Sequence, residues 1–487
     1  MNNGELRLTR ADYGRFRDLV MERSGLYFPE AKQQSLRRGL AEALGMSSCD
    51  SLDEYYEMLL YSRSNSSQWD RLVSALTVGE TYFFRNQGHF DALGKHILPE
   101  LIARWEHRNR RIRIWSAGCA TGEEPYSIAM LLHELIPNLA SWNILILATD
   151  INRAALYQAQ EGVYGPWSFR GVEKRIQDRY FKLNGNKRYA IANEVKRMVT
   201  FNYLNLVDDY YPSLSNNTNA MDVILCRNVT IYFNSEVTQQ VVDRFYKCLT
   251  NGGRLVPGAS EPNLVFFQNF EPRNYPGAVV YQKPLVAKER ERPVFTLRPL
   301  VKTPQPEPLP KVPDKKEGKP SPSPDPYQAA LELLQAGQVD EALVKLYGKL
   351  DQDPDFVPTY YALGKVYANK GNLEEAQNWC ERAIKKDKLQ PEPYFILSMI
   401  YQQFGLLEMA VDNLKKALYL DPTFALAHYN LANIHRQQGN TTLARKSFQN
   451  VQRLLKGKPK DELIRKGDGL AVGRLLQLVE MALAGGP

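Results

Sequence analysis

A repeat of 34 residues in the C-terminal part of the chain limits its fold more than any other feature. Four glycines stand 34 residues apart, and an alanine follows each of them after five residues. A unit of this length is expected to be a helix-turn-helix, in which the glycine ends the first helix and the alanine lets the second pack closely. An unrelated helical bundle with accidental spacing is the alternative, and so regular an interval disfavours it. The residues are Gly337, Gly371, Gly405 and Gly439, with Ala342, Ala376, Ala410 and Ala444.

This interval, with small residues where helices cross, resembles the tetratricopeptide repeat. The resemblance implies four repeats over residues 327–456 that stack as an α-solenoid. It also implies a concave face that binds an unknown protein or peptide and carries no chemistry. Residues 457–487 are expected to form a tail with a helix over Leu470 to Leu483, which either caps the last repeat or docks elsewhere.

A proline-rich segment separates these repeats from the rest of the chain. It carries twelve prolines in the 43 residues from Pro284 to Pro326, so it cannot sustain helix or strand hydrogen bonding. We expect a semi-rigid, extended linker over residues 284–326, between two halves that fold separately.

Length and composition narrow the class of protein. A chain of 487 residues predicts two or three domains, and 44% hydrophobic with 24% charged residues is typical of folded, soluble proteins. No run of eighteen apolar residues and no signal-like N-terminus is found, so we expect no direct membrane insertion. Five scattered cysteines without a CxxC pair suit a reducing cytoplasm and give no metal site.

The charge does not indicate nucleic-acid binding. A formal charge of +8 is modest for this length, and no nucleic-acid motif accompanies it. The basic segment that includes Arg111 and Arg113 is interpreted as a solvated face.

The N-terminal half divides into two domains. Residues 1–78 show helical periodicity without strand alternation, which predicts an all-α domain. In residues 79–283, strand-like and helical runs alternate, which predicts an α/β, Rossmann-like domain on a mostly parallel sheet. A small antiparallel β-subdomain is expected as an insert at about residues 160–203, with a hairpin over Tyr189 to Phe201.

A loop of small residues marks the candidate binding site. The strand Ile112–Trp115 leads into Ser116–Gly122, where Gly118 lets a ligand approach the backbone, and then into a helix that begins with Glu123. The loop lacks GxGxxG and a phosphate-binding lysine, so it suits a ligand without phosphates, such as S-adenosylmethionine. Asp150 ends the next strand, where a carboxylate can accept hydrogen bonds from ribose hydroxyls. Its alternative role is a helix N-cap.

Five motifs, in order and spacing, resemble the chemoreceptor glutamate methyltransferase family, CheR, over roughly residues 8–283. The resemblance implies a helical domain followed by a methyltransferase domain with a β-subdomain insert. The motifs are Thr81 to Arg85 (TYFFR), Ser116 to Ser127 (SAGCATGEEPYS), Ala148 to Ile151 (ATDI), Asn205-Leu206, and Cys226 to Phe233 (CRNVTIYF).

The resemblance further implies residue roles. Arg85 and Tyr232 would lie near the transferred methyl group, and Gly79 departs from the family pattern, which has asparagine there. The positions implied for binding S-adenosylmethionine, and its product S-adenosylhomocysteine, are Thr81, Arg85, Gly118, Glu123, Asp150, Asn205, Leu206, Asn228 and Val229.

The expected reaction is methyl ester formation on glutamate side chains in the cytoplasmic helical domain of a chemoreceptor. A glutamate carboxylate, with a pKa of about 4.3, is already a nucleophile at neutral pH, so no strong general base is required. Two alternatives stay open: a methyltransferase of the same fold that acts on another carboxylate or protein, and a non-catalytic tetratricopeptide scaffold with a vestigial pocket.

Overall fold

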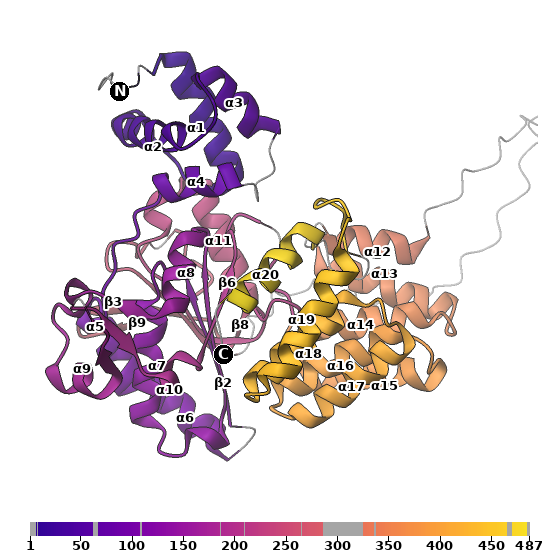
Figure 1. The fold of residues 1–487 in the computed structure, drawn as a ribbon. Coiled ribbons are helices and arrows are strands. Elements are labelled where there is room, and N and C mark those ends of the chain that lie inside the picture. Colours follow the sequence, from indigo (N-terminus) through magenta and orange to yellow (C-terminus); the bar gives the residue numbers. More distant parts are fainter. Residues whose placement is uncertain are drawn as a thin grey trace, which may run out of the picture.

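The computed structural model describes residues 6, 8–61, 67–107, 110–185, 187–208, 210–263, 265–285, 325–335, 338–464 and 470–484. Most of the predicted linker, and Gly337 of the repeat pattern, lie outside the described residues. Figure 1 shows three folded parts: N-terminal helices, an α/β domain and a stack of C-terminal helices. No helix in the described part of the chain combines the length and the apolar character needed to cross a membrane.

The N-terminal part is an all-α domain, as predicted, with four α-helices in its described residues. A capping box starts its first helix, where the Thr9 side chain and the Asp12 side chain each accept a hydrogen bond from the other's backbone. Phe16, Tyr55 and Trp69 are buried in its core. The helices are α1 (Arg10–Ser24), α2 (Gln33–Gly45), α3 (Leu52–Tyr61) and α4 (Ser67–Leu76).

The middle part is an α/β domain on a seven-stranded sheet, with strand order β6-β2-β1-β7-β8-β10-β9. The first five strands in this order are parallel, and β10 and β9 are antiparallel to their neighbours. The strands are β1 (Arg111–Ala117), β2 (Asn143–Asp150), β6 (Val199–Tyr203), β7 (Met221–Cys226), β8 (Leu249–Pro257), β9 (Glu271–Tyr275) and β10 (Ala278–Gln282).

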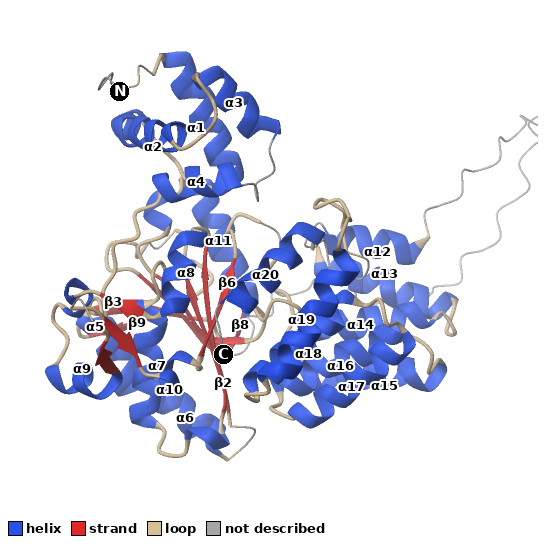
Figure 2. Ribbon diagram, viewed as in Figure 1, coloured by secondary structure: helices blue, strands red, loops and turns tan. Residues whose placement is uncertain are grey.

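Helices surround this sheet (Figure 2). Every residue of β1 and β7 is buried, because both are central strands with both faces covered. The helices of the domain are α5 (Gln87–Ala92), a π-helical turn η2 (Leu93–Ile97), α6 (Leu98–Glu106), α7 (Glu123–Leu135), α8 (Arg153–Glu161), α9 (Lys174–Tyr180), α10 (Asn193–Lys196) and α11 (Ser235–Cys248).

The strand order places a ligand site. Going outward from β1, the chain builds β2 and β6 on one side and β7 and β8 on the other, so the direction of winding reverses between β1 and β7. In open α/β sheets ligands bind at this reversal, beyond the carboxyl ends of the strands. The loops after β1, β2 and β7 therefore define where the site is expected.

A three-stranded antiparallel sheet forms the small subdomain, with the order β3-β5-β4. The predicted hairpin over Tyr189 to Phe201 is wrong, because its two strands belong to different sheets: β5 pairs with β3 and β4, and β6 pairs in parallel with β2. Local alternation indicates a strand but not its partner. The strands are β3 (Val163–Tyr164), β4 (Phe181–Leu183) and β5 (Tyr189–Ile191).

The C-terminal part is a stack of antiparallel helix pairs with the predicted period. Gly371, Gly405 and Gly439 end a first helix with φ of +80°, +76° and +77°, a conformation that favours glycine. Ala376 and Ala410 are fully buried where helices cross. The helices are α12 (Pro326–Gln335), α13 (Val339–Gln352), α14 (Val357–Asn369), α15 (Leu373–Lys386), α16 (Pro391–Gln403), α17 (Leu407–Leu420), α18 (Ala425–Gln437), α19 (Thr441–Leu455) and a last helix α20 (Val472–Ala484).

The repeat domain docks on the α/β domain through the C-terminal ends of α14 and α16, each of which is the first helix of its repeat. Asn143 Nδ2 donates to the carbonyl oxygens of Gln402 and Gln403, at 3.1 and 2.9 Å. Asn219 Nδ2 donates to the carbonyl oxygen of Ala368 at 2.9 Å. Because helix ends leave carbonyl groups without partners, these amides satisfy groups that would otherwise need water.

Arg111 and Arg113 correct the sequence interpretation of a solvated basic face. Both are buried, because they lie in the central strand β1 rather than on a surface helix. Arg113 Nη2 donates to the carbonyl oxygens of Asn217 and Asn219, at 2.9 and 3.2 Å. Arg113 thus holds the same loop that receives the repeat domain.

Four residues, which we name the Tyr203 clasp, join all three parts: Asp70, Arg153, Tyr203 and Arg474. The guanidinium carbons of Arg153 and Arg474 lie 3.7 and 3.9 Å from the centroid of the Tyr203 ring. Both cations therefore make a close cation–π contact with the same ring. Arg153 Nε donates to Asp70 Oδ1 of α4 at 2.9 Å, and Arg474 of α20 donates to the Tyr203 carbonyl oxygen.

Candidate functional site

The loop after β1 has the close backbone packing that its small residues predict. Gly118 and Gly122 have φ of +79° and +92°, and Ala120 has φ of +47°. A Cβ on Gly118 would lie 2.3 Å from Val229 Cγ2, so only glycine fits. Gly118 therefore packs closely against Val229, so the loop after β1 lies against the loop after β7 at the point where the winding of the sheet reverses.

Asp150 joins the loop after β2 to the loop after β1. Its Oδ2 accepts from the backbone N–H of Ala120 and its Oδ1 from that of Asn152, both at 2.8 Å. The helix N-cap is Asn152, whose side chain accepts from Ala155 N, so the N-cap role considered for Asp150 is wrong. Burial raises the pKa of Asp150, and hydrogen bonds from backbone amides oppose this rise. Each carboxylate oxygen retains a lone pair that can accept from a ligand hydroxyl.

Glu123 links the loop after β1 to the small subdomain. The residue is 2% exposed, and its carboxylate accepts from Thr121 Oγ1 at 2.6 Å and from Ser168 Oγ at 3.0 Å. Burial raises its pKa, and these hydroxyl donors act in the opposite direction. Both partners are neutral, so the negative charge at Glu123 is not cancelled by them.

The segment from Thr81 to Arg85 lies beside the same loop. Phe84, with φ of +57°, donates its N–H to Ser127 Oγ at 3.0 Å, and this bond fixes the segment against α7. Thr81 and Arg85 are partly exposed, and Arg85 Nη1 donates to the Glu80 carbonyl oxygen at 2.8 Å.

Tyr232 lies close to Arg85. Burial raises the pKa of the Tyr232 hydroxyl, and the positive charge of Arg85 lowers it. The Tyr232 carbonyl oxygen accepts from the backbone N–H of Tyr27 at 2.8 Å, which ties this residue to the N-terminal domain. Tyr232 therefore lies at the domain junction, within range of the Arg85 charge.

Asn205 and Leu206 lie at the end of β6, under the N-terminal domain. Both are buried. Asn205 Nδ2 donates to the Arg23 carbonyl oxygen at 2.8 Å and to Asp208 Oδ1 at 3.2 Å. Because both amide hydrogens are used, a further contact from this side chain has to come through its oxygen.

Glu124 and Arg227 form a buried ion pair that was not predicted. Arg227 Nη1 donates to Glu124 Oε2 at 2.9 Å, and Ser116 Oγ donates to Glu124 Oε1 at 2.6 Å. Arg227 also donates to the Arg85 carbonyl oxygen and to His89 Nδ1, at 2.5 and 3.0 Å. Arg227 thus sets the segment of Arg85 against the loop after β1. The sequence signal was available, because both charged residues stand inside the quoted motifs.

Glu261 is a second residue that sequence reasoning missed. Its carboxylate accepts from the backbone N–H groups of Asn228, Val229 and Thr230, at 2.7, 2.9 and 2.8 Å. It also accepts from Gly258 N at 2.6 Å, which shows that one carboxylate holds two loops. Asn228 has φ of +59°, and such conformations persist only where surrounding contacts enforce them. An acidic residue in a Gly/Ser/Pro loop after a strand is too common a pattern to have indicated this role.

The chemistry of these groups fits a ligand with hydroxyls and positive charge. The Asp150 and Glu123 carboxylates accept hydrogen bonds from the loop that would have to bind a phosphate, and their negative charge disfavours one. No group of three His, Cys, Asp or Glu suited to a metal ion occurs in the described part of the chain. The adenosyl, amino-acid and sulfonium groups of S-adenosylmethionine match this donor set.

Family models match both N-terminal domains and the repeats. Residues 79–273 match the SAM-binding domain of CheR methyltransferase, and residues 11–77 match its all-alpha domain. Tetratricopeptide repeat models match residues 333–395, 399–439 and 425–454. Among solved structures, the crystal structure of MamA covers 32% of this chain and 93% of its own, with 22% identity and a TM-score of 0.25, a likeness too weak to bear on function.

Three chemotaxis methyltransferases are similar to somewhat more than half of the chain. Chemotaxis protein methyltransferase 2 of Vibrio cholerae is 31% identical over 289 residues, which make up 59% of this chain and 98% of that protein. The chemotaxis protein methyltransferase of Borreliella burgdorferi is 33% identical, over 53% of this chain and 90% of that protein. Chemotaxis protein methyltransferase 1 of Pseudomonas aeruginosa is 34% identical, over 52% and 90%. Tetratricopeptide repeats lie within residues 333–454. The chain therefore belongs to the CheR family of chemotaxis methyltransferases.

Proposed function

We propose that this protein transfers the methyl group of S-adenosylmethionine to glutamate side chains in the cytoplasmic helical domain of a chemoreceptor. Family membership supports the proposal, together with the junction of the loops after β1, β2 and β7. Since a receptor's cytoplasmic domain is the substrate, the enzyme would act in the cytoplasm. S-adenosylhomocysteine would be the product.

We assign the cofactor contacts to the loops that meet at the reversal of the sheet. Asp150 would accept hydrogen bonds from the ribose hydroxyls, and Glu123 would face the positive charge of the amino-acid part. Gly118 and Val229 would set how closely the ligand approaches the backbone. The remaining proposed contacts are Thr81, Arg85, Asn205, Leu206 and Asn228.

The proposed catalysis depends on orientation. Bound S-adenosylmethionine supplies a methyl group that its own sulfonium activates. Arg85 attracts the incoming glutamate carboxylate, and the Tyr232 hydroxyl orients it, so that an oxygen of the carboxylate faces the methyl carbon. Holding the reacting atoms in line can contribute about 7 kcal/mol or more to lowering the barrier.

The junction between these loops also favours an enzyme over a vestigial scaffold. The side chains of Glu261, Arg227 and Asp150 all make hydrogen bonds at this junction. Three non-glycine residues there have positive φ. Such strain costs about 1–3 kcal/mol per residue, and a pocket without a task gains nothing from it. The three residues are Phe84, Ala120 and Asn228.

A transfer assay with methyl-labelled S-adenosylmethionine and a receptor cytoplasmic fragment tests the proposal. The expected product is a base-labile methyl ester on glutamate. Label on another protein or another residue type would point to a different methyltransferase of the same fold. Calorimetry with S-adenosylhomocysteine distinguishes the proposed enzyme from a non-catalytic scaffold. The scaffold alternative predicts no binding at millimolar ligand.

Arg85→Ala is expected to reduce methyl transfer by two orders of magnitude or more, because it removes the charge that orients the carboxylate. Thermal unfolding should change little, since Arg85 makes one side-chain hydrogen bond to a carbonyl oxygen on its own segment. Arg175→Ala, at an exposed arginine that pairs with Glu134 away from the site, is the matched control. Unchanged turnover in Arg85→Ala would remove the proposed role.

A further inference from the structure

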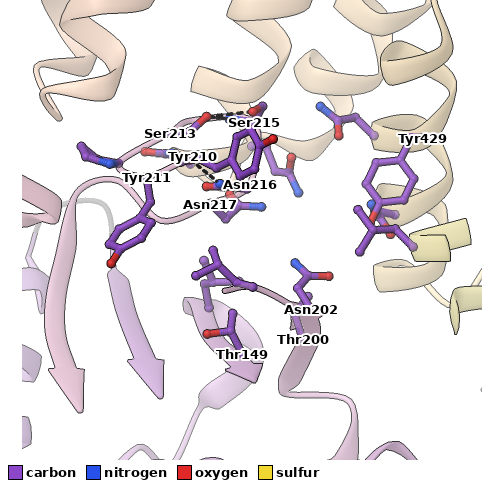
Figure 3. A pocket seen from close by; sticks show the side chains of 18 of the residues that line it. Thr149, Thr200, Asn202, Tyr210, Tyr211, Ser213, Ser215, Asn216, Asn217 and Tyr429 are labelled. Carbon is purple, nitrogen blue, oxygen red and sulfur yellow. Dashed lines mark hydrogen bonds between the residues drawn. The ribbon is translucent and has the colours of Figure 1, made fainter. Parts of the chain in front are cut away.

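A large cleft separates the α/β domain from the repeat domain. Its volume is about 2860 Å³, and its lining includes β6 on one side and helices α14, α18, α19 and α20 on the other. Figure 3 shows part of this lining. None of the residues proposed for cofactor binding or catalysis lines it. The cleft is therefore a separate site, to which the methyl-transfer reaction assigns no task.

One wall of the cleft is an unpaired sheet edge. Strand β6 is the terminal strand of the seven-stranded sheet, and among the residues that the structure describes it pairs with β2 alone. All five of its residues line the cleft, and Thr200, Phe201 and Asn202 are partly exposed. In a parallel pair, alternate residues of an edge strand direct their N–H and C=O groups away from the partner. These groups can receive another strand.

The opposite wall carries amides and an aromatic ring. On α18, residues at helical spacing face the cleft: Tyr429, Asn430, Asn433 and Gln437. Figure 3 shows Tyr429 across from Thr200 and Asn202 of β6. Side-chain amides both donate and accept hydrogen bonds, so they suit the backbone of an extended peptide.

The cleft concentrates the positive charge of the protein. Twelve lysines and arginines line it, against four aspartates and glutamates. The chain as a whole has 62 basic and 54 acidic residues, a net charge of +8. The residues that line the cleft alone have the same excess of positive charge. Lys365 is among these residues, and burial lowers its pKa to about 8. A negatively charged ligand would relieve the repulsion between these cations.

The chain's own linker does not fit this charge. Residues 286–324 include nine lysines and arginines and five acidic residues, which gives them an excess of positive charge. The occupant has to come from another polypeptide and be acidic.

We infer that the cleft binds an extended acidic peptide segment of a partner protein, which adds as a strand to the edge of β6 and lies against α18. The five residues of β6 offer roughly 17 Å of strand edge. Arg474 occupies the Tyr203 carbonyl oxygen and so limits the peptide at that end. This inference goes beyond the proposed function and does not depend on it.

Fluorescence anisotropy with the full chain and labelled nonapeptides tests the inference without cofactor or receptor. A peptide of alternating glutamate and valine is expected to bind, and one of alternating lysine and valine is not. Binding should weaken as salt rises, because the cleft charges are partly exposed. No binding of the glutamate peptide at millimolar concentration, or equal binding of both peptides, would overturn the inference.

Charge reversal locates the binding. The triple variant Arg436→Glu, Arg445→Glu and Lys446→Glu changes three exposed cleft residues and should weaken binding at least tenfold. The control variant Lys385→Glu, Lys388→Glu and Lys415→Glu changes the net charge equally at exposed residues of the same domain outside the cleft. Equal weakening in both variants would mean non-specific attraction and contradict the site.

Backbone methylation of the probe tests the strand addition. Two glutamate–valine peptides carry N-methyl groups at either the odd or the even positions, so each lacks N–H donors along one edge. A strand pairs with β6 along one edge only, so one version should lose binding and the other keep it. The same result for both versions, whether binding or loss, would refute the strand addition.

Discussion

Gly79 stands where the resemblance noted in the sequence implies asparagine, and the structure has room there for a larger side chain. A Cβ at Gly79 meets no atom within 4 Å, and its backbone does not have positive φ. Gly79→Asn is therefore expected to fold and to restore one hydrogen bond to the cofactor. A net gain of about 1 kcal/mol corresponds to about fivefold tighter binding of S-adenosylhomocysteine.

Titration calorimetry of Gly79→Asn beside Gly79→Ala separates the amide from the added Cβ. Gly79→Ala changes only backbone freedom and should bind like the wild type. If Gly79→Asn also binds like the wild type, the position makes no cofactor contact in this chain.

His89 makes stability depend on pH. Burial and the Arg227 guanidinium lower the pKa of His89 to about 4, and its Nδ1 accepts from Arg227 Nε, so the ring is neutral in the folded protein. The unfolded chain protonates it near pH 6.5 and binds more protons below that value. The stability from His89 is thus complete above pH 6.5 and is lost as the pH falls toward 4.

His89→Gln should keep an acceptor for Arg227 without titrating. Between pH 7 and pH 5 the wild type should lose about 2 kcal/mol more unfolding free energy than this variant. Urea unfolding at the two pH values measures the difference. Equal losses would show that His89 is not held neutral.

At the scale of secondary structure, elements with a strong local pattern could be predicted from the sequence. The glycines of the repeat turns and the loop from Ser116 to Gly122 were found because each requires a particular residue at a particular backbone conformation. Strand β6 was given the wrong partner, because pairing depends on residues far along the chain. Its sequence, Val199 to Tyr203, fits an edge of the large sheet as well as a hairpin.

The candidate site was predictable only as far as its motifs reach. Asp150 and Gly118 stand in motifs, and the structure brings their loops together. Glu261 lies in no quoted motif, and its role arises from contacts with residues more than thirty positions away. Arg113 was taken for a solvated residue because charge alone does not reveal that a strand is central.

Helix α20 is held by the Tyr203 clasp, which makes Arg474 the residue to change. Arg474→Ala removes a desolvated cation–π contact, for which about 2 kcal/mol is expected, and a hydrogen bond to Tyr203. Hydrogen–deuterium exchange of α20 should accelerate by about thirtyfold. Arg453→Ala, an exposed arginine of α19, should leave it unchanged. Equal exchange in the two variants would mean that the clasp does not hold the helix.

At the scale of the whole molecule, the catalytic half should fold and bind without the repeats. The hydrogen bonds described at the site come from residues before 262, and 98% of a relative's length aligns with 59% of this chain. A chain that ends at Pro284 should bind S-adenosylhomocysteine within about threefold of the full chain, because every residue proposed for the cofactor lies before Pro284. The lost interface hydrogen bonds, at about 1 kcal/mol each, should lower stability rather than cofactor affinity.

Calorimetry and receptor turnover of this truncated chain give separate answers. Loss of S-adenosylhomocysteine binding in a chain that circular dichroism shows to be folded would mean that the repeats build the site. If binding is retained and turnover of the receptor is slower, the repeats recruit the substrate. If turnover is faster, the repeats restrain the enzyme.

Because Arg474 contacts Tyr203, the two ends of the stretch 204–473 lie next to each other. The polypeptide crosses from one half to the other through the proline-rich segment, and it returns through the last helix. A protease that cuts this segment would sever the covalent connection while the halves stay together as one particle. The covalent connection through this segment is therefore not needed to hold the two halves together.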